Sequence, residues 1–181
     1  MSKATAMVLA LMASFGGAAA ASAQQAPASN PADVVPETMP FATPYGAPIS
    51  LARAQAVIGA AMAEAGKHGW AMNVAVVDSG ANLVAFARMD GAHLAGVAIA
   101  EHKARSAAIF RRPTRVFEDA IQKSDNKALL TLDGISALRG GIPLIEDGKL
   151  IGAIGCAGGA TTQDEASCLV GAATINKSGT P

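Results

Sequence analysis

MNVAVVDSGANLVAFARM, residues 72–89, is the stretch that indicates the fold of the chain most clearly. Two runs rich in β-formers, Met72–Val77 and Leu83–Met89, flank the turn-forming residues Asp78-Ser79-Gly80-Ala81-Asn82. Two such runs separated by a short turn predict a β-hairpin.

A second hairpin is expected in the C-terminal half. There, Glu146-Asp147-Gly148-Lys149 separates Ile142–Ile145 from Leu150–Ala157. Because short turns join antiparallel strands, the two hairpins together predict an antiparallel sheet.

Four segments with helical spacing of apolar residues surround the hairpins: Leu51–Ala65, Leu94–Phe110, Arg115–Lys123 and Gln163–Ile175. Ser50 and Thr114 are expected N-caps, and Thr162 with Glu165 has the spacing of a capping box. Strand pairs with helices between them predict a single α+β domain over residues 49–181.

The charge balance argues against nucleic acid as a partner. The 181 residues carry 14 Lys plus Arg and 14 Asp plus Glu, so the formal net charge is zero. A nucleic-acid-binding surface usually needs an excess of basic residues. Hydrophobic residues reach 51% but aromatic residues only 4%, which suits close packing of Ala and Gly and disfavours an aromatic stacking platform.

Residues 1–23 have the pattern of a signal peptide. Lys3 precedes the apolar run Met7–Ala21, and Ala21-Ser22-Ala23 presents small residues for cleavage. The run is short for a membrane span, although an uncleaved anchor is the alternative. We expect cleavage after Ala23, a periplasmic or secreted protein, and no membrane span in the mature chain.

Residues 24–48 form a Pro-rich arm or linker with six prolines: Pro27, Pro31, Pro36, Pro40, Pro44 and Pro48. Proline excludes an ordinary helix or central strand here. Apolar members such as Val35, Met39 and Tyr45 favour an arm docked on the domain or on a neighbouring subunit. A spacer without docking is the alternative.

Several common catalytic motifs are absent from the sequence. It contains no G-x-x-x-x-G-K-[ST] phosphate loop, no G-x-S-x-G nucleophile turn and no H-E-x-x-H zinc motif. The glycines between 152 and 159 do not form the G-x-G-x-x-G of a dinucleotide site. These absences lower the expectation of a hydrolase, a nucleotide enzyme or a zinc enzyme.

The helical segment 94–110 and the loop before it hold the first candidate ligand-binding residues. His93 in the loop and His102 on the helix each offer an imidazole that can bind iron. Lys103 has apolar neighbours, so it either extends to solvent or lines a pocket as a cation for a carboxylate.

The small-residue loop that follows the second hairpin is the other candidate region. Gly158 and Gly159 lead into a helix N-terminus, whose free N–H groups bind anions; alternatively they allow close packing. Cys156 and Cys168 are the only cysteines. In an oxidising compartment they form either a disulfide or two buried thiols.

Residues 51–177 resemble the GlcG/HbpS-like family of haem-binding or haem-degrading-like domains. The resemblance rests on pieces in a fixed order: Val74-Ala75-Val76-Val77-Asp78, Arg88-Met89-Asp90-Gly91-Ala92, Lys103-Ala104-Arg105-Ser106-Ala107, Arg112-Pro113-Thr114, Gly140-Gly141-Ile142-Pro143-Leu144, Gly148-Lys149-Leu150-Ile151-Gly152 and Gln163-Asp164-Glu165.

The resemblance implies a profilin-like fold, in which helices flank an antiparallel sheet, and a homo-oligomer. Some members of the family bind haem, and others accompany the catabolism of small acids. In the haem-binding relatives the hydroxyl of the Lys-Ala-x-Ser/Thr-Ala segment is linked to the site, and the resemblance assigns this position to Ser106. Some exported relatives take part in haem or redox sensing.

Three functions remain open from the sequence. The first is an exported binding protein for haem or a related tetrapyrrole, with His93, His102, Lys103 and Ser106 at the site. The second is an enzyme, or an enzyme-like domain, for a small organic acid, its pocket lined by Asp78, Arg88, Asp90, Lys103 and the Gly158-Gly159 loop. The third is an oligomeric accessory protein without a ligand.

Overall fold

The computed structural model describes residues 35–39 and 42–176. The expected signal peptide, residues 1–23, lies outside this range. The chain divides into two compact units, 1–37 and 38–181, and all the described helices and strands lie in the second. In chain order they are α1 (Leu51–Lys67), β1 (Asn73–Asp78), β2 (Leu83–Arg88), α2 (Gly96–Phe110), α3 (Arg115–Ser124), the 3₁₀ helix η2 (Lys127–Thr131), β3 (Gly141–Glu146), β4 (Lys149–Ala157) and α4 (Thr161–Ala172).

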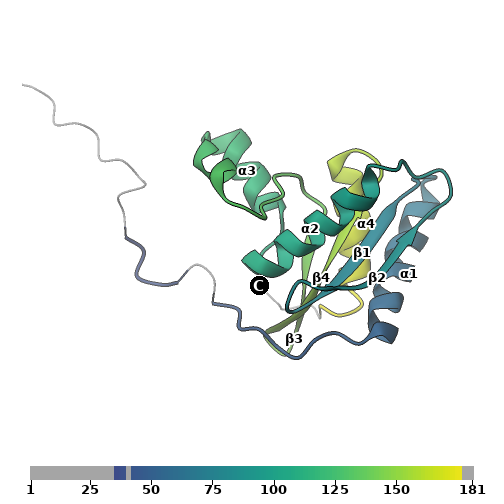
Figure 1. The fold of residues 1–181 in the computed structure, drawn as a ribbon, viewed down its shortest axis with the longest axis horizontal. Coiled ribbons are helices and arrows are strands. Elements are labelled where there is room, and N and C mark those ends of the chain that lie inside the picture. The colour runs from purple at the N-terminus through teal and green to yellow at the C-terminus, as the bar shows by residue number, and fades with distance from the viewer. Residues whose placement is uncertain (1–34, 40–41, 177–181) are drawn as a thin grey trace, which may run out of the picture. The chain divides into compact units, whose positions relative to one another are not determined.

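The four described strands form one antiparallel sheet in the order β2-β1-β4-β3 (Figure 1). Both predicted hairpins are present, β1–β2 and β3–β4. The β3–β4 turn places Asp147 at φ 48° and Gly148 at φ 72°. Positive φ at both central residues is the requirement of the two-residue turns that best match strand twist.

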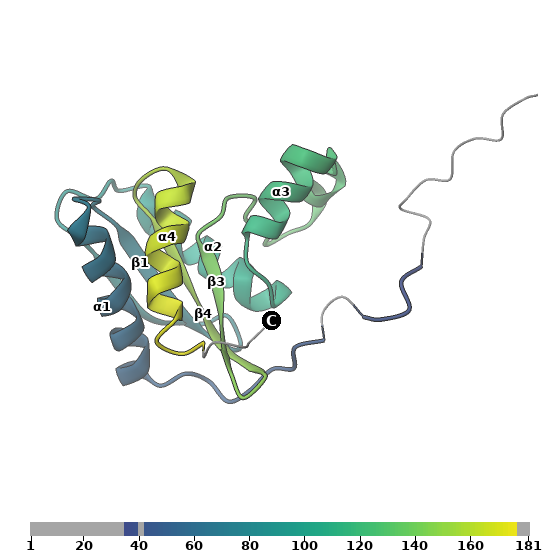
Figure 2. The same cartoon turned by 180° about the vertical axis from the view of Figure 1, so that it is seen from behind.

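Helices cover both faces of the sheet, as Figures 1 and 2 show from opposite sides. On one face, α1 and α4 pack against Val74, Val76 and Ile154. On the other face, the alanines of α2 pack against Ala75, Val77 and Ala153. Alternate residues of β1 point to opposite faces, so this strand is buried on both sides.

The α2 helix lies directly on the sheet backbone because glycine occupies two strand positions beneath it. A Cβ on Gly155 would collide with Ala100 O, and one on Gly141 with Lys103 O. The alanine-rich, aromatic-poor composition is therefore explained by close contact between helix and sheet.

Residues 43–48 of the Pro-rich arm run along the domain. Leu150 N donates to Pro44 O at 2.8 Å and Gly46 N donates to Leu150 O at 2.7 Å, which places the arm parallel to the start of β4. Tyr45 Oη also donates to Ile109 O at 2.9 Å. The docked-arm alternative therefore applies to this part of the arm.

Three expected helix caps need correction. Ser50 immediately precedes α1, but its side chain makes no capping hydrogen bond. Gln163, and not Glu165, caps the N-terminus of α4, because its Oε1 accepts the Ala160 N–H at 2.9 Å. Thr114 precedes α3, but its hydroxyl bonds Leu138 O and Gly141 N instead of capping the helix. The 3₁₀ helix η2 was not predicted, because its five residues are too few for helical periodicity to be recognised.

Candidate functional site

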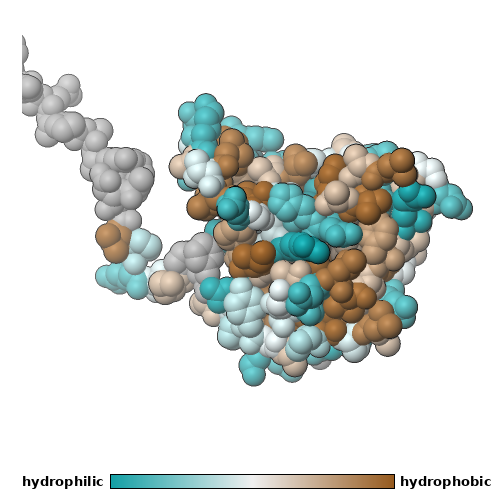
Figure 3. Space-filling model, viewed as in Figure 1, coloured by the Kyte–Doolittle hydropathy of each residue, from teal (hydrophilic) through white to brown (hydrophobic). Residues whose placement is uncertain are grey.

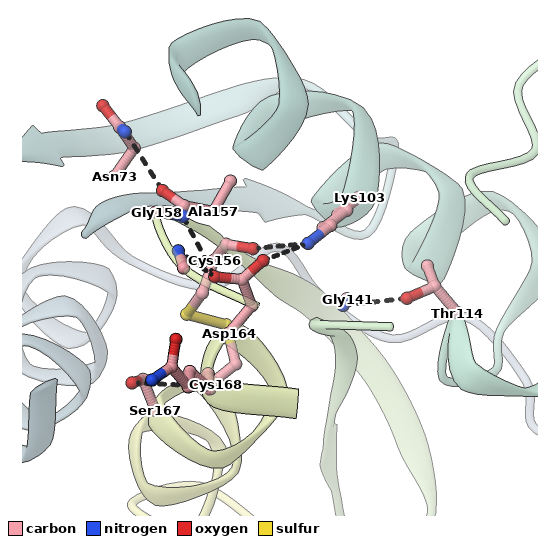
Figure 4. The surroundings of a disulfide bond; sticks show 12 residues. Asn73, Lys103, Thr114, Gly141, Cys156, Ala157, Gly158, Asp164, Ser167 and Cys168 are labelled. Atoms are coloured by element: carbon pink, nitrogen blue, oxygen red, sulfur yellow. Dashed lines mark hydrogen bonds and ion pairs between the residues drawn. A yellow bond between two sulfur atoms is a disulfide. The ribbon is translucent and has the colours of Figure 1, made fainter. Parts of the chain in front are cut away.

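A buried ion pair lies at the centre of the candidate region, between the two helices on opposite faces of the sheet (Figure 4). Lys103 Nζ of α2 donates to Asp164 Oδ2 of α4 at 2.7 Å and to Cys156 O at 3.0 Å. The side chains of Lys103 and Asp164 are 1% and 4% exposed. A buried charge is tolerated when it is paired and its remaining bonds are satisfied, as both are here.

The other carboxylate oxygen of Asp164 accepts the N–H groups of Gly158 and Gly159, each at 3.0 Å. The N-terminus of α4 thus binds a carboxylate, but the carboxylate belongs to the chain itself. The two glycines therefore bind an anionic group, as one interpretation predicted. Gly158 also allows close packing, as the alternative predicted, because a Cβ at this position would collide with Ala71 O.

Cys156 and Cys168 form a disulfide that links β4 to α4 beside the ion pair (Figure 4). Their Cα atoms lie 5.8 Å apart, and both residues are buried. Of the two alternatives, the structure contains the bonded form. The disulfide and the ion pair therefore connect α4 to the rest of the domain at neighbouring points.

Lys103 does not extend to solvent, and its ammonium group faces Asp164 in place of a ligand. Ser106, one turn further along α2, is fully buried, and its Oγ accepts the Ser136 N–H at 3.0 Å. Both residues therefore have structural partners on the inner side of α2.

The prediction that Asp78 lines the same pocket as Arg88 and Asp90 is wrong: Asp78 lies at the opposite end of β1, where its Oδ1 accepts the Gly80 and Asn82 N–H groups of the turn. Arg88, Asp90 and the Gly158-Gly159 loop do gather at one end of the sheet. Asn73 is paired with Arg88 on β2 and with Ala157 on β4, which places Arg88 and the Gly158-Gly159 loop on either side of β1. Asp90 follows directly, and both Arg88 and Asp90 are exposed.

His93 belongs to the same end. Its Nδ1 accepts the Gly96 N–H at 3.0 Å, so a neutral His93 carries its proton on Nε2. Neither nitrogen then offers a free lone pair, and binding of iron by His93 requires the contact with Gly96 to break.

Asn73 holds this loop in place from within the sheet. Its Nδ2 donates to His93 O at 3.2 Å and to Ala157 O at 3.0 Å. Its Oδ1 is the one buried side-chain polar atom without a partner among the described residues. A buried acceptor of this kind usually has an ordered water as its partner.

His102 differs from the other two histidines. It lies on the exposed side of α2, and no described residue forms a hydrogen bond or ion pair with its ring. His68 stacks on Trp70 and contacts Glu64, and His93 is held by Gly96. His102 is therefore the imidazole most available to an external ligand.

A charge network that sequence reasoning missed joins α3, α4 and the loop before β3. Arg139 donates to Glu118 Oε1 at 2.8 Å and lies 3.4 Å from both Asp119 and Glu165. The hydrogen bond that Arg139 donates to the Glu118 carboxylate raises the pKa of Arg139. Glu165 belongs to the Gln163-Asp164-Glu165 piece of the resemblance, but nothing in the sequence indicated Arg139 as its partner.

The outer side of α2 carries the residue types that a surface-bound haem would need. No three His, Cys, Asp or Glu side chains among them gather at a point that could hold a metal ion. The outer side of α2 supplies the imidazole of His102 and the guanidinium of Arg105, with Ile109 half exposed. Figure 3 shows apolar and polar groups interleaved on the face that α2 and α3 occupy. An imidazole, an apolar contact surface and a cation for a propionate are what a shallow haem site needs.

In the described part of the chain, no helix has the length and apolar character needed to cross a bilayer.

The sequence of residues 49–173 matches the family model described as haem degrading protein HbpS-like. Protein GlcG of Escherichia coli strain K12 is 37% identical over 107 residues, covering 59% of this chain and 79% of that protein.

Solved structures are similar as well. A double mutant of Streptomyces reticuli HbpS matches with a TM-score of 0.67 and 28% identity, covering 83% of this chain and 99% of the other. A structure described as a PduOC:heme complex matches with a TM-score of 0.64 and 26% identity, covering 71% and 96%.

Proposed function

Because the chain belongs to the HbpS-like family, we propose that it is an exported binding protein for haem or a related tetrapyrrole. One observation about its own residues carries the proposal. The ring of His102 is exposed on α2 and is engaged by no described residue, whereas the other two histidines have partners.

The outer side of α2 would hold the ligand. His102 would bind the iron, and Ile109 would contact the ring. Arg105, whose Nη2 lies 3.7 Å from Glu101 Oε2, would exchange this exposed contact for one with a propionate. Bound haem would supply a redox-active iron at the surface of the protein, which is compatible with a role in haem handling or redox sensing. Lys103 and Ser106 act indirectly, from the buried side of α2. Lys103 joins α2 to Asp164 of α4, and Ser106 joins it to the backbone of Ser136 in the loop before β3.

Site residues at the end of the sheet have a supporting part in this proposal. Arg88 and Asp90 are exposed, and they would offer polar contacts to a ligand that extends to this end of the sheet. His93 is a reserve ligand that becomes available only when its bond to Gly96 opens. Gly158 and Gly159 stay committed to Asp164.

Export is supported by two features. The signal pattern of residues 1–23 directs the chain out of the cytoplasm, and the disulfide suits an oxidising compartment such as the periplasm. A shallow site also suits a homo-oligomer, in which a neighbouring subunit covers the second side of the ligand. Half-exposed apolar side chains such as Ile109, Leu130 and Leu132 favour such a contact.

Addition of hemin to the purified protein, followed by visible absorption, tests the proposal. We expect a Soret shift that saturates at a fixed ratio of haem to subunit, with micromolar or tighter affinity. Iron-free protoporphyrin is the control, and it should bind more weakly because it cannot use His102. A change in absorption that rises without saturation would refute the proposal. Sedimentation of the same samples measures the oligomer.

A further inference from the structure

The two edge strands of the sheet differ in how their outer sides are protected. The strand order β2-β1-β4-β3 leaves β2 and β3 with one neighbour each. At β3, the side chain of Asn176 takes the place of a second neighbour, because its Oδ1 accepts the Ile145 N–H at 2.8 Å and its Nδ2 donates to Pro143 O at 3.0 Å. Proline also offers no N–H to an added strand. No described side chain protects the backbone of β2 in this way.

The backbone of β2 turns hydrogen-bonding groups to its open side. Met89 N donates to Met72 O at 2.9 Å, which continues the register of β1 and β2. In an antiparallel pair, residues that bond to the neighbouring strand alternate with residues whose N–H and C=O face away from it. Arg88 and Phe86 therefore face outward. Val84 has no counterpart on β1, because the register shifts at this point.

The side chains of β2 do not prevent the addition of a strand. The sequence LVAFAR contains no proline, and Arg88, at the end of the strand, is its single charged residue. None of the six residues is fully buried, whereas five of the six in β1 are. Phe86 is partly buried against the α2 side of the sheet, and Leu83 is 43% exposed. An open, apolar edge of this kind is a template for pairing with another strand.

A second copy of β2 is complementary to this edge in hydrogen bonding and in charge. When two copies pair about a two-fold axis, outward-facing residues meet outward-facing residues, so Phe86 lies opposite the partner subunit's Phe86. Cross-strand aromatic pairs of this kind are stabilising. Arg88 then lies beside the start of the partner's β2, at the turn that contains Asp78. Opposite charges therefore approach each other at both ends of the pair.

From these features we infer that β2 pairs with β2 of a second copy of the chain, antiparallel and centred on Phe86. The pairing joins the two four-stranded sheets into one continuous sheet. The inference rests on the homo-oligomer of the proposed function and deepens it by naming a contact surface. It requires neither haem nor His102, because the outer side of α2 is not part of this edge.

Cysteine cross-linking of the purified protein tests the register of the pair. The two native cysteines are bonded to each other, so an introduced cysteine is the only free thiol. In the inferred pair, the Cα atoms of the two copies of residue 86 lie about 5.5 Å apart, within the range of a disulfide, and those of residue 83 about 20 Å apart. With the thiol oxidant diamide, we expect Phe86→Cys to form at least tenfold more covalent dimer than Leu83→Cys. Equal yields, or no dimer from Phe86→Cys, would overturn the inference.

Charged substitutions at the axis test the same contact without a cross-link. Phe86→Lys and Phe86→Glu each place two like charges opposite each other, so we expect sedimentation to show at least tenfold weaker association in either variant. An equimolar mixture pairs opposite charges and should associate at least tenfold more tightly than each variant alone. Val170→Lys, at a 39% exposed position on α4, is the control and should associate as the unsubstituted protein does. A mixture that associates no more tightly than its components would contradict pairing at Phe86.

The cross-link separates this inference from the proposed function. If a charged variant fails to fold, Phe86→Cys still decides the question, because it adds no charge to the strand. An oligomer without the Phe86→Cys cross-link would retain the homo-oligomer and overturn the pairing through β2. A cross-linked dimer that binds hemin without saturation would retain the pairing and refute the haem proposal.

Discussion

Lys103 Nζ lies 2.7 Å from Asp164 Oδ2, and the two side chains are among the most deeply buried charged groups of the described chain. The pair joins α2 on one face of the sheet to α4 on the other. It therefore fixes the helix that presents His102 outward to the helix that carries the disulfide.

Removal of either partner should be strongly destabilising. Lys103→Met leaves Asp164 as an uncompensated buried charge, and Asp164→Asn does the same to Lys103, each at a cost of about 3–5 kcal/mol in the free energy of unfolding. The double substitution should recover part of this loss. Urea unfolding measures all three.

The exposed pair of Lys67 with Glu64 provides the control, since Lys67→Ala should cost less than about 1 kcal/mol. Losses below that value in both single variants of the buried pair would contradict its structural role.

The disulfide should stabilise the folded protein by lowering the conformational entropy of the unfolded chain, in which it closes a loop. Cys156 and Cys168 are 12 residues apart. For a loop of that size, the chain-entropy estimate is about 3 kcal/mol. We expect reduction to lower the urea midpoint correspondingly, and thiol titration of the unreduced, denatured protein to find no free thiol. Two reactive thiols in protein purified from an oxidising compartment would contradict the bond.

Acid should weaken the charge network around α3. The hydrogen bond from Lys123, followed by the charges of Lys123 and Arg115, lowers the pKa of Asp119 below its ordinary value of 3.8. Because the folded pKa is the lower one, the stabilisation is complete above the unfolded pKa and is lost as pH falls through the folded pKa. Arg139 also contacts Asp119, and Arg115 contacts Glu165 as well as Asp119.

Urea midpoints measured from about pH 6 down to about pH 2.5 check this dependence. We expect the midpoint to fall below about pH 4, and to fall less steeply in Asp119→Asn, which has no carboxylate to protonate. Equal slopes in the two proteins would show that Asp119 contributes nothing to the acid response.

Ser106 has a structural partner that can be tested separately from haem. Ser106→Ala leaves the Ser136 N–H without its acceptor in a buried position, which should cost about 1–2 kcal/mol. Ser167→Ala serves as a comparison, because Ser167 Oγ donates to Gln163 O within α4 and its loss orphans no N–H. A stable Ser106→Ala protein with weakened haem binding would instead assign the hydroxyl to the ligand.

The strands and helices were predictable because their signals are local. Asp147-Gly148 specifies its turn by itself, and the spacing of apolar residues in α1 does not depend on the rest of the chain. The family resemblance was confirmed by the match over residues 49–173.

The contacts of the site were not predictable from such signals. Lys103 and Asp164 are 61 residues apart, and only the packing of both helices against the sheet brings them together. The same holds for Arg139 and Glu165. The Gly96 contact that occupies His93 depends on how the loop enters α2, which spacing alone does not define.

The three histidines offer the most direct test of haem binding on the outer side of α2. Hemin titrations of His102→Ala, His93→Ala and His68→Ala should be compared with that of the unsubstituted protein. We expect His68→Ala to saturate as the unsubstituted protein does, and His102→Ala to lose at least tenfold in affinity, or about 1.4 kcal/mol, with a changed Soret maximum. Haem binding by His102→Ala with unchanged affinity and spectrum would contradict the assignment of His102 as the iron ligand.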